Sequence, residues 1–213
     1  MKILSPSFPS TPTRPDDIID LFDSEDDIVG VHIEDTWFET NDLEKKSISE
    51  SLLSKVVFSQ VDVPRFDASD CEFKACTFTA AKFPESIWNR IAVDGTRCTG
   101  LQITNGRIKN AVFKNSKLEI VNFRFTWLEN VRFENCALDD VDFYEAHLKN
   151  VEFINCTISK VTFARAMMTN VDVSQSTIDT IVGIASLRGV TMSHDQLMQL
   201  APYLAKEAGI KIK

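Results

Sequence analysis

Residues 109–113 read KNAVF, and the chain repeats this unit as ENVRF at 129–133, KNVEF at 149–153 and TNVDV at 169–173. The copies lie twenty residues apart, and within each step the apolar positions recur every five residues. Every fifth residue from Ile33 to Ile178 is apolar. A fixed short period is typical of repeat architectures. A period of five matches neither the 3.6-residue helix nor the two-residue strand, so this pattern predicts a different kind of regular structure.

A second inward column lies two residues before the first one. Between Ser51 and Ser176 its members are small or apolar. A chain that points two of every five residues inward, and turns a corner after each unit, forms a square tube in which twenty residues close one coil. We therefore expect regular coils from about residue 50, after an irregular entry over 31–50. Phenylalanines should line two opposite inner faces, one with Phe83, Phe123, Phe143 and Phe163, the other with Phe73, Phe113, Phe133 and Phe153.

The unit A/V/C-x-F/L-x-x resembles the pentapeptide-repeat family over roughly residues 31–192. This resemblance implies an all-β solenoid, namely a right-handed quadrilateral parallel β-helix of pentapeptide repeats with a C-terminal capping helix. The repeat is weaker between residues 84 and 106, where proline, tryptophan and three glycines interrupt it. A bulge or a bent coil is expected in that stretch.

The sequence divides into three parts. Residues 1–30 comprise a proline-rich arm and an acidic segment from Asp16 to Asp27, which is either a short helix or a solvated tail. Residues 31–192 form the solenoid. Residues 193–213 form a helix that begins at Ser193 and presents an apolar stripe with Leu197, Leu200 and Leu204. This helix either covers the end of the tube or also joins two tubes into a homodimer, as in several proteins that the chain resembles.

Composition and charge exclude several classes of function. The 213 residues carry a net charge of −8, which disfavours direct binding to nucleic acid or to an anionic membrane. The sequence contains neither an apolar run long enough for a membrane span nor a secretory signal, and its five cysteines lack CxxC spacing. We expect buried thiols in the cytoplasm.

The sequence offers no constellation for catalysis. The three histidines at 32, 147 and 194 are far apart, and four cysteines lie in the small inward column with Cys98 in the large one. No nucleophile–base pair, phosphate-binding loop or metal-ligand spacing emerges. We therefore expect a protein that is not an enzyme and has no cofactor and no metal.

Two surface features remain as candidate binding sites. The first is an acidic coil with Asp139, Asp140, Asp142 and Glu145. A straight acidic rod can occupy a DNA-binding groove, with carboxylates in place of phosphates. The uninterrupted tube resembles the quinolone-resistance branch of the family, which implies a DNA-mimicking regulator of a type II topoisomerase, DNA gyrase. A block of net charge +5 over residues 89–118 argues against a uniform mimic.

The second feature is an outward cluster of Phe125, Trp127, Tyr144, His147 and Met167, which we call the aromatic corner. Exposed aromatic side chains are enriched at protein interfaces. The alternative function is therefore a protein-interaction scaffold whose partner the sequence does not name. Both hypotheses describe a binding protein.

Overall fold

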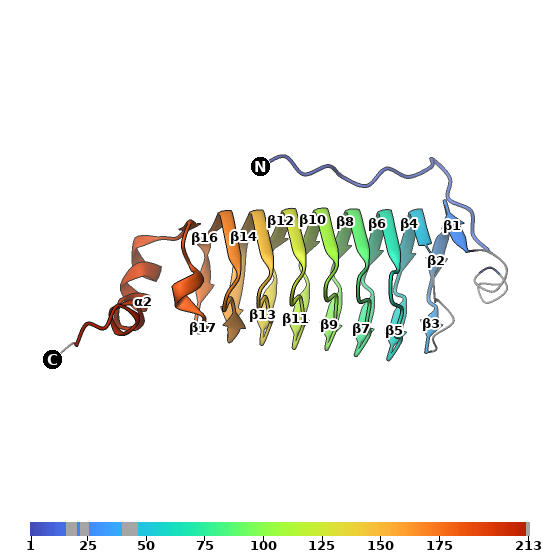
Figure 1. Cartoon of the computed structure of the whole chain (residues 1–213). Helices are drawn as coiled ribbons and strands as arrows, with labels where there is room; N and C mark the ends of the chain where they lie inside the picture. The colour runs from blue at the N-terminus through green and yellow to red at the C-terminus, as the bar shows by residue number, and fades with distance from the viewer. Residues whose placement is uncertain (16–20, 22–25, 40–46, 212–213) are drawn as a thin grey trace.

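The structure is a computed structural model, and it describes residues 1–15, 21, 26–39 and 47–211. It is a parallel β-solenoid of about 8 turns followed by one helix (Figure 1). The long strands form one row, with β4 (Ser47–Ser54), β6 (Asp67–Lys74), β8 (Ile87–Asp94), β10 (Arg107–Lys114), β12 (Trp127–Glu134), β14 (His147–Ser159) and β16 (Met167–Ile178). Two short strands, β1 (Asp27–Val29) and β2 (His32–Glu34), begin this row and both pair with β4.

The remaining elements are short. A second row comprises β3 (Trp37–Phe38), β5 (Val57–Ser59), β7 (Thr77–Thr79), β9 (Arg97–Thr99), β11 (Lys117–Glu119) and β13 (Ala137–Asp139), which pairs with the end of β14. After these come β15 (Val161–Thr162), β17 (Ile181–Val182), the 3-10 helix η1 (Ile184–Ser186), β18 (Val190–Thr191) and α2 (His194–Glu207).

Neighbouring coils pair in steps of twenty residues. Ile108 pairs with Leu128, and Leu128 pairs with Leu148. The same step already holds at the start of the solenoid, where β1 pairs with β4. The predicted closure of one coil by four five-residue units is therefore confirmed. The acidic segment 16–27 and the entry coil at 40–46 lie largely outside the described residues, so the predictions for them stay predictions.

Two phenylalanine ladders run through the apolar core, and Phe38, Phe58 and Phe78 stack in a further column at its N-terminal end. Phe113, Phe133 and Phe153 stack with ring centroids 5.0 Å apart. Phe143 stacks within the second ladder and meets Phe133 edge to face at 6.4 Å. The rings thus combine offset stacking along the tube with edge-to-face contacts across it, the two arrangements that the aromatic quadrupole favours. The predicted assignment of phenylalanines to two opposite faces is confirmed.

The corners of the tube are left-handed. From residue 50 to residue 170, every residue whose number is a multiple of five has φ between 48° and 70°. This region disfavours most side chains and is readily adopted by glycine and asparagine. Gly95 and Gly100 occupy two of these corners, while Asn110, Asn130 and Asn150 occupy others.

The bulge expected between residues 84 and 106 is absent from the structure, so that prediction was wrong. Strand β8 pairs with both β6 and β10 in uninterrupted steps of twenty. The glycines at 95 and 100 fit the left-handed corners, and Trp88 is buried and stacks on Phe73 at 5.4 Å. The register instead shifts between β14 and β16, near Ile154.

The helix α2 closes the C-terminal end of the tube. Ser193 caps it, and the predicted capping box with Gln196 is present. The Gln196 amide also donates to the carbonyl oxygens of Val173 at 2.8 Å and Ser176 at 2.6 Å, which belong to the last full coil. Leu200 is buried. The helix therefore satisfies exposed strand edges and covers the core, as a solenoid end requires.

The left-handed corners predict a stabilising substitution at Ile120. Ile120 has φ 55° and is 62% exposed, so a β-branched side chain is held in a disfavoured conformation without burial in return. Ile120→Asn should raise the free energy of unfolding by about 1 kcal/mol, measured by urea denaturation. Ile87→Asn is the matched control, since Ile87 is 50% exposed within a strand, and it should bring no gain. Equal or lower stability of Ile120→Asn would contradict the strain.

Candidate protein-interaction surface

Cations of neighbouring coils pair with the acidic coil. The Asp139 carboxylate lies 3.5 Å from the Lys160 ammonium, Asp142 lies 3.8 Å from Arg124, and Glu145 lies 3.0 Å from Arg165. The hydrogen bond from Arg165 lowers the pKa of Glu145 below its ordinary value. Asp140 lies at an exposed left-handed corner of the tube. Much of the negative charge that would imitate phosphates is therefore compensated locally.

The basic block at 89–118 provides further compensation. Lys109, Lys114 and Lys117 lie 3.5, 3.2 and 2.6 Å from the carboxylates of Glu129, Glu134 and Glu119. The block carries +5, and the following residues 119–145 carry −5. Because the two blocks occupy adjacent coils, opposite charges stack along the tube and largely cancel.

The aromatic corner contains two ring pairs, Trp127 with His147 and Phe125 with Tyr144. In the first pair, Trp127 begins β12 and His147 begins β14, and the register places them side by side. Their rings are parallel within 4°, with centroids 4.0 Å apart, and Trp127 remains 51% exposed. The Arg107 guanidinium lies 5.8 Å from the Trp127 ring, and Met167 continues the column beside His147.

The second ring pair is Phe125 and Tyr144. The rings meet edge to face at 5.9 Å. The guanidinium of Arg124 lies 4.5 Å from the Tyr144 ring, and that of Arg165 lies 5.6 Å from it. Tyr144 therefore has two cation–π partners, each of which also pairs with a carboxylate. Phe125 is exposed, although its φ of 60° makes this corner costly for an aromatic residue.

A hollow of about 420 Å³ lies beside the first ring pair. Its lining includes the Trp127 and His147 rings, the Met167 side chain and the charged ends of Glu129 and Lys149. The ammonium of Lys149 contacts the Glu129 carboxylate at 3.1 Å, and this hydrogen bond lowers the pKa of Glu129. An apolar concavity with a charged rim can accept a side chain of a partner.

The structure thus divides the five residues of the predicted cluster into two groups, Trp127 with His147 and Met167, and Phe125 with Tyr144, and shows no ring contact between the groups among the described residues. Sequence reasoning missed the arginines. Arg107 lies twenty residues before Trp127, Arg124 lies twenty before Tyr144, and Arg165 lies twenty after Glu145. The same twenty-residue step that reveals the fold could therefore have found these cation–π and ion-pair partners.

The structure also bears on the other candidate sites. All five cysteines are free and buried, and burial raises the pKa of the Cys71 thiol to about 12. Among the described residues, no three His, Cys, Asp or Glu side chains lie close enough to hold a metal ion. Within the same part of the chain, the structure contains no helix of the length and apolar character needed to cross a membrane.

A protein-family model described as "Pentapeptide repeat region" matches residues 126–191. A search of curated proteins gives no match.

Among solved structures, a trypsin-treated variant of QnrB1, a plasmid-mediated fluoroquinolone resistance protein, is 17% identical, with a TM-score of 0.46 and coverage of 88% of this chain and 100% of that one. HetL, a pentapeptide repeat protein involved in heterocyst differentiation regulation from the cyanobacterium Nostoc sp. strain PCC 7120, is 10% identical, with a TM-score of 0.30 and coverage of 78% and 89%. Rfr23 from the cyanobacterium Cyanothece 51142 is 17% identical, with a TM-score of 0.36 and coverage of 61% and 88%.

Proposed function

We propose that this solenoid, whose residues 126–191 match a pentapeptide-repeat model, is a non-enzymatic binding protein whose docking surface is the aromatic corner. The observation that carries this proposal is the exposed, parallel stack of Trp127 on His147 beside a hollow of about 420 Å³. The buried free thiols favour a reducing compartment, the cytoplasm.

The side chains of the aromatic corner are preorganised for binding. Binding hot spots are enriched in tryptophan, tyrosine and arginine, and the two ring pairs of this corner contain all three: Trp127 with Arg107, and Tyr144 with Arg124 and Arg165. Stacking between coils already fixes the ring planes, so these side chains lose little conformational entropy when a partner docks. Arg165 and Arg124 are held by Glu145 and Asp142, with their guanidinium groups 5.6 and 4.5 Å from the Tyr144 ring.

A type II topoisomerase such as DNA gyrase is the partner to test first, given the family branch that the sequence resembles. DNA mimicry is the second candidate mechanism. The net charge of −8 favours it, as does the acidic register of Glu119 and Asp139 in adjacent strands β11 and β13. The ion pairs described above weaken it, because paired carboxylates present less potential to a DNA-binding groove.

The two mechanisms predict that different variants lose gyrase binding. Trp127→Ala should weaken gyrase binding by about tenfold or more, with little dependence on salt, because an aromatic anchor is lost. The set Asp139→Asn, Asp140→Asn, Asp142→Asn and Glu145→Gln should weaken it less, and that loss should shrink as salt rises. The measurement is gyrase binding at two salt concentrations, together with supercoiling activity with and without a fluoroquinolone.

Trp37→Ala is the matched control, since Trp37 is 63% exposed on β3, far from the aromatic corner, and should leave binding unchanged. Loss of binding in the variant whose four acidic residues are replaced by amides, with normal binding of Trp127→Ala, would favour DNA mimicry instead. A folded parent protein that neither binds gyrase nor alters its activity would reject gyrase as the partner.

We further propose that two chains meet end to end through α2. The helix buries Gln196 and Leu200 against the last coil, while Leu204 is half-buried and Leu197, Met198 and Tyr203 are exposed. The outer side of an end cap faces away from its own tube, so an apolar patch there fits a second copy of the same cap.

Leu197→Lys combined with Met198→Lys should halve the molar mass measured by light scattering, because both lysines would place charge in the interface. Melting should stay nearly unchanged, since neither side chain is in the core. Lys206→Ala is the control and should keep the mass of the parent. A monomeric parent would leave α2 as a lid alone.

A further inference from the structure

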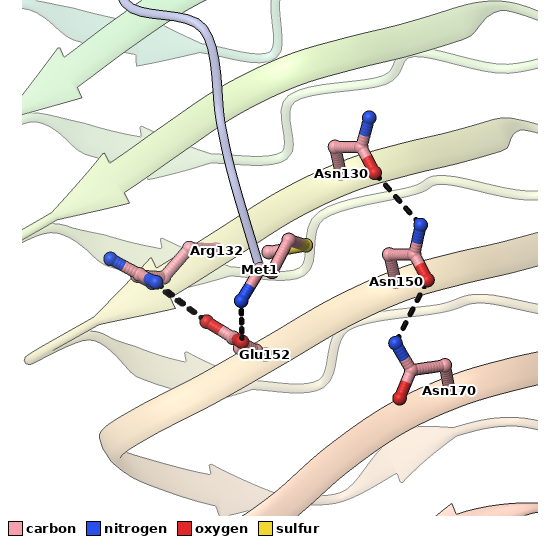
Figure 2. Close-up of polar contacts among 6 residues, drawn as sticks. All are labelled: Met1, Asn130, Arg132, Asn150, Glu152 and Asn170. Atoms are coloured by element: carbon pink, nitrogen blue, oxygen red, sulfur yellow. Dashed lines mark hydrogen bonds and ion pairs between the residues drawn. The ribbon is translucent and has the colours of Figure 1, made fainter.

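The N-terminal arm, residues 1–15, lies along the outside of the solenoid. Figure 1 shows it running from the β1 end back along the row of long strands, with its N-terminus near β12 and β14. Three contacts fix its path. Thr13 pairs with Val31, the Ser7 N–H donates to the Asp70 carboxylate at 3.1 Å, and the Met1 nitrogen lies 3.4 Å from the Glu152 carboxylate (Figure 2).

The arm contacts the solenoid with a period of three residues. Its half-buried residues are Ile3, Pro6, Pro9, Pro12 and Pro15, and every residue between them is exposed. A polyproline II helix has three residues per turn, so one of its three edges carries every third side chain. The burial pattern and the four prolines therefore indicate a polyproline II segment lying on one edge.

The spacings of the arm and the solenoid match. Three residues of polyproline II advance about 9.3 Å, and two coils at the usual strand spacing advance about 9.6 Å. From Ser7 to Met1 the arm advances six residues, or about 19 Å. The two anchors, Asp70 and Glu152, lie about four coils apart, which is also about 19 Å. Between these two anchors, the inward residues Ile3 and Pro6 are thus spaced by about two coils.

The surface beneath the arm suits such a segment. We define the arm track as the outer surface between the two anchors, Asp70 and Glu152, with Arg90, Ala92, Asn110 and Val112 in the coils between them. Asn110 is only 4% exposed, although Asn170, in the same amide ladder beyond the end of the arm, is exposed. Ala92 and Val112 are outward-facing small apolar residues in neighbouring strands β8 and β10.

Charged groups hold the ends of the arm track. Arg90 binds the Asp70 carboxylate through its guanidinium, with Nε 2.6 Å from Oδ1, and Ser7 donates to the same oxygen. At the other end, Arg132 binds Glu152 at 2.7 Å beside Met1, next to the amide ladder of Asn130, Asn150 and Asn170 (Figure 2). The acidic anchors complement the net charge of +2 on residues 1–15.

We propose that the arm track is a binding site for polyproline II segments, that residues 1–7 of the arm occupy it as an internal ligand, and that a proline-rich segment of a partner with the same three-residue spacing displaces them. The regular coil spacing gives the site its repeat, and the inward residues Ile3 and Pro6 indicate that it accepts an apolar residue or a proline at every third position. This surface is distinct from the aromatic corner, so the proposal stands independently of the function proposed above.

The test uses the full-length chain and a labelled peptide with the sequence of residues 1–15. The variant Ile3→Ser, Pro6→Ser, Pro9→Ser weakens the track-facing edge of the arm. It should bind the peptide at least about tenfold more tightly than the parent does, because a tethered ligand competes at an effective concentration near the millimolar range. Fluorescence anisotropy measures the affinity.

Matched controls locate the site. The variant Leu4→Ser, Phe8→Ser changes two exposed arm residues and should bind the peptide as weakly as the parent. A peptide of the same composition whose prolines no longer recur every three residues should not bind. Val112→Asp, added to the track-facing variant, should abolish binding without altering the aromatic corner. Absence of peptide binding to the folded track-facing variant, or equal binding to all variants, would overturn the proposal.

A second measurement needs no substitution. In the parent chain the Ser7 amide is hydrogen-bonded to Asp70, so its hydrogen exchange should be slowed. Excess unlabelled peptide should accelerate that exchange by displacing the arm, while the Thr13 amide, bonded to the Gly30 carbonyl at 2.8 Å, should exchange as before. Unchanged exchange at Ser7 under a large excess of peptide would contradict displacement.

Discussion

The left-handed corner at every fifth residue is the constraint on which the rest of the structure depends. Each corner turns the chain onto the next side of the square, and after four corners the chain lies beside its starting strand, one strand spacing further along. Because the turn recurs at a fixed interval, the parallel strands of neighbouring coils pair in a register of twenty residues. The two phenylalanine ladders follow from that register, since each ring meets its equivalent in the next coil.

The same register organises the surface into columns. Residues twenty apart become neighbours, so a tryptophan meets a histidine, an arginine meets a tyrosine, and asparagines form a continuous ladder. Charge follows the same rule, and lysines of one coil neutralise glutamates of the next. The solenoid is thus acidic overall but mostly compensated locally, whereas the Trp127 ring remains 51% exposed. This difference is why the aromatic corner supports recognition better than the acidic coil does.

Much of the fold could be predicted from sequence, because the apolar period of five is set by burial and burial is encoded residue by residue. The unbroken apolar frame ends at Ile178, and beyond it β18 pairs with β16 at a step of nineteen, Val171 with Val190. The interruption predicted around Gly95 and Gly100 failed because composition alone does not reveal that glycine suits a left-handed corner. The docked arm was missed because its three-residue period becomes meaningful only beside the coil spacing.

The most direct test of this account is to remove one whole coil. Deletion of residues 90–109 joins Asn89 to Asn110 and keeps every later residue in its column, and since coils interact chiefly with their neighbours, a shorter tube should form. Circular dichroism should report the same β-structure, and urea unfolding should stay cooperative. Deletion of residues 90–107 removes eighteen residues, shifts the corners out of register and should abolish folding. Equal behaviour of the two deletions would contradict the claim that a twenty-residue register holds the molecule together.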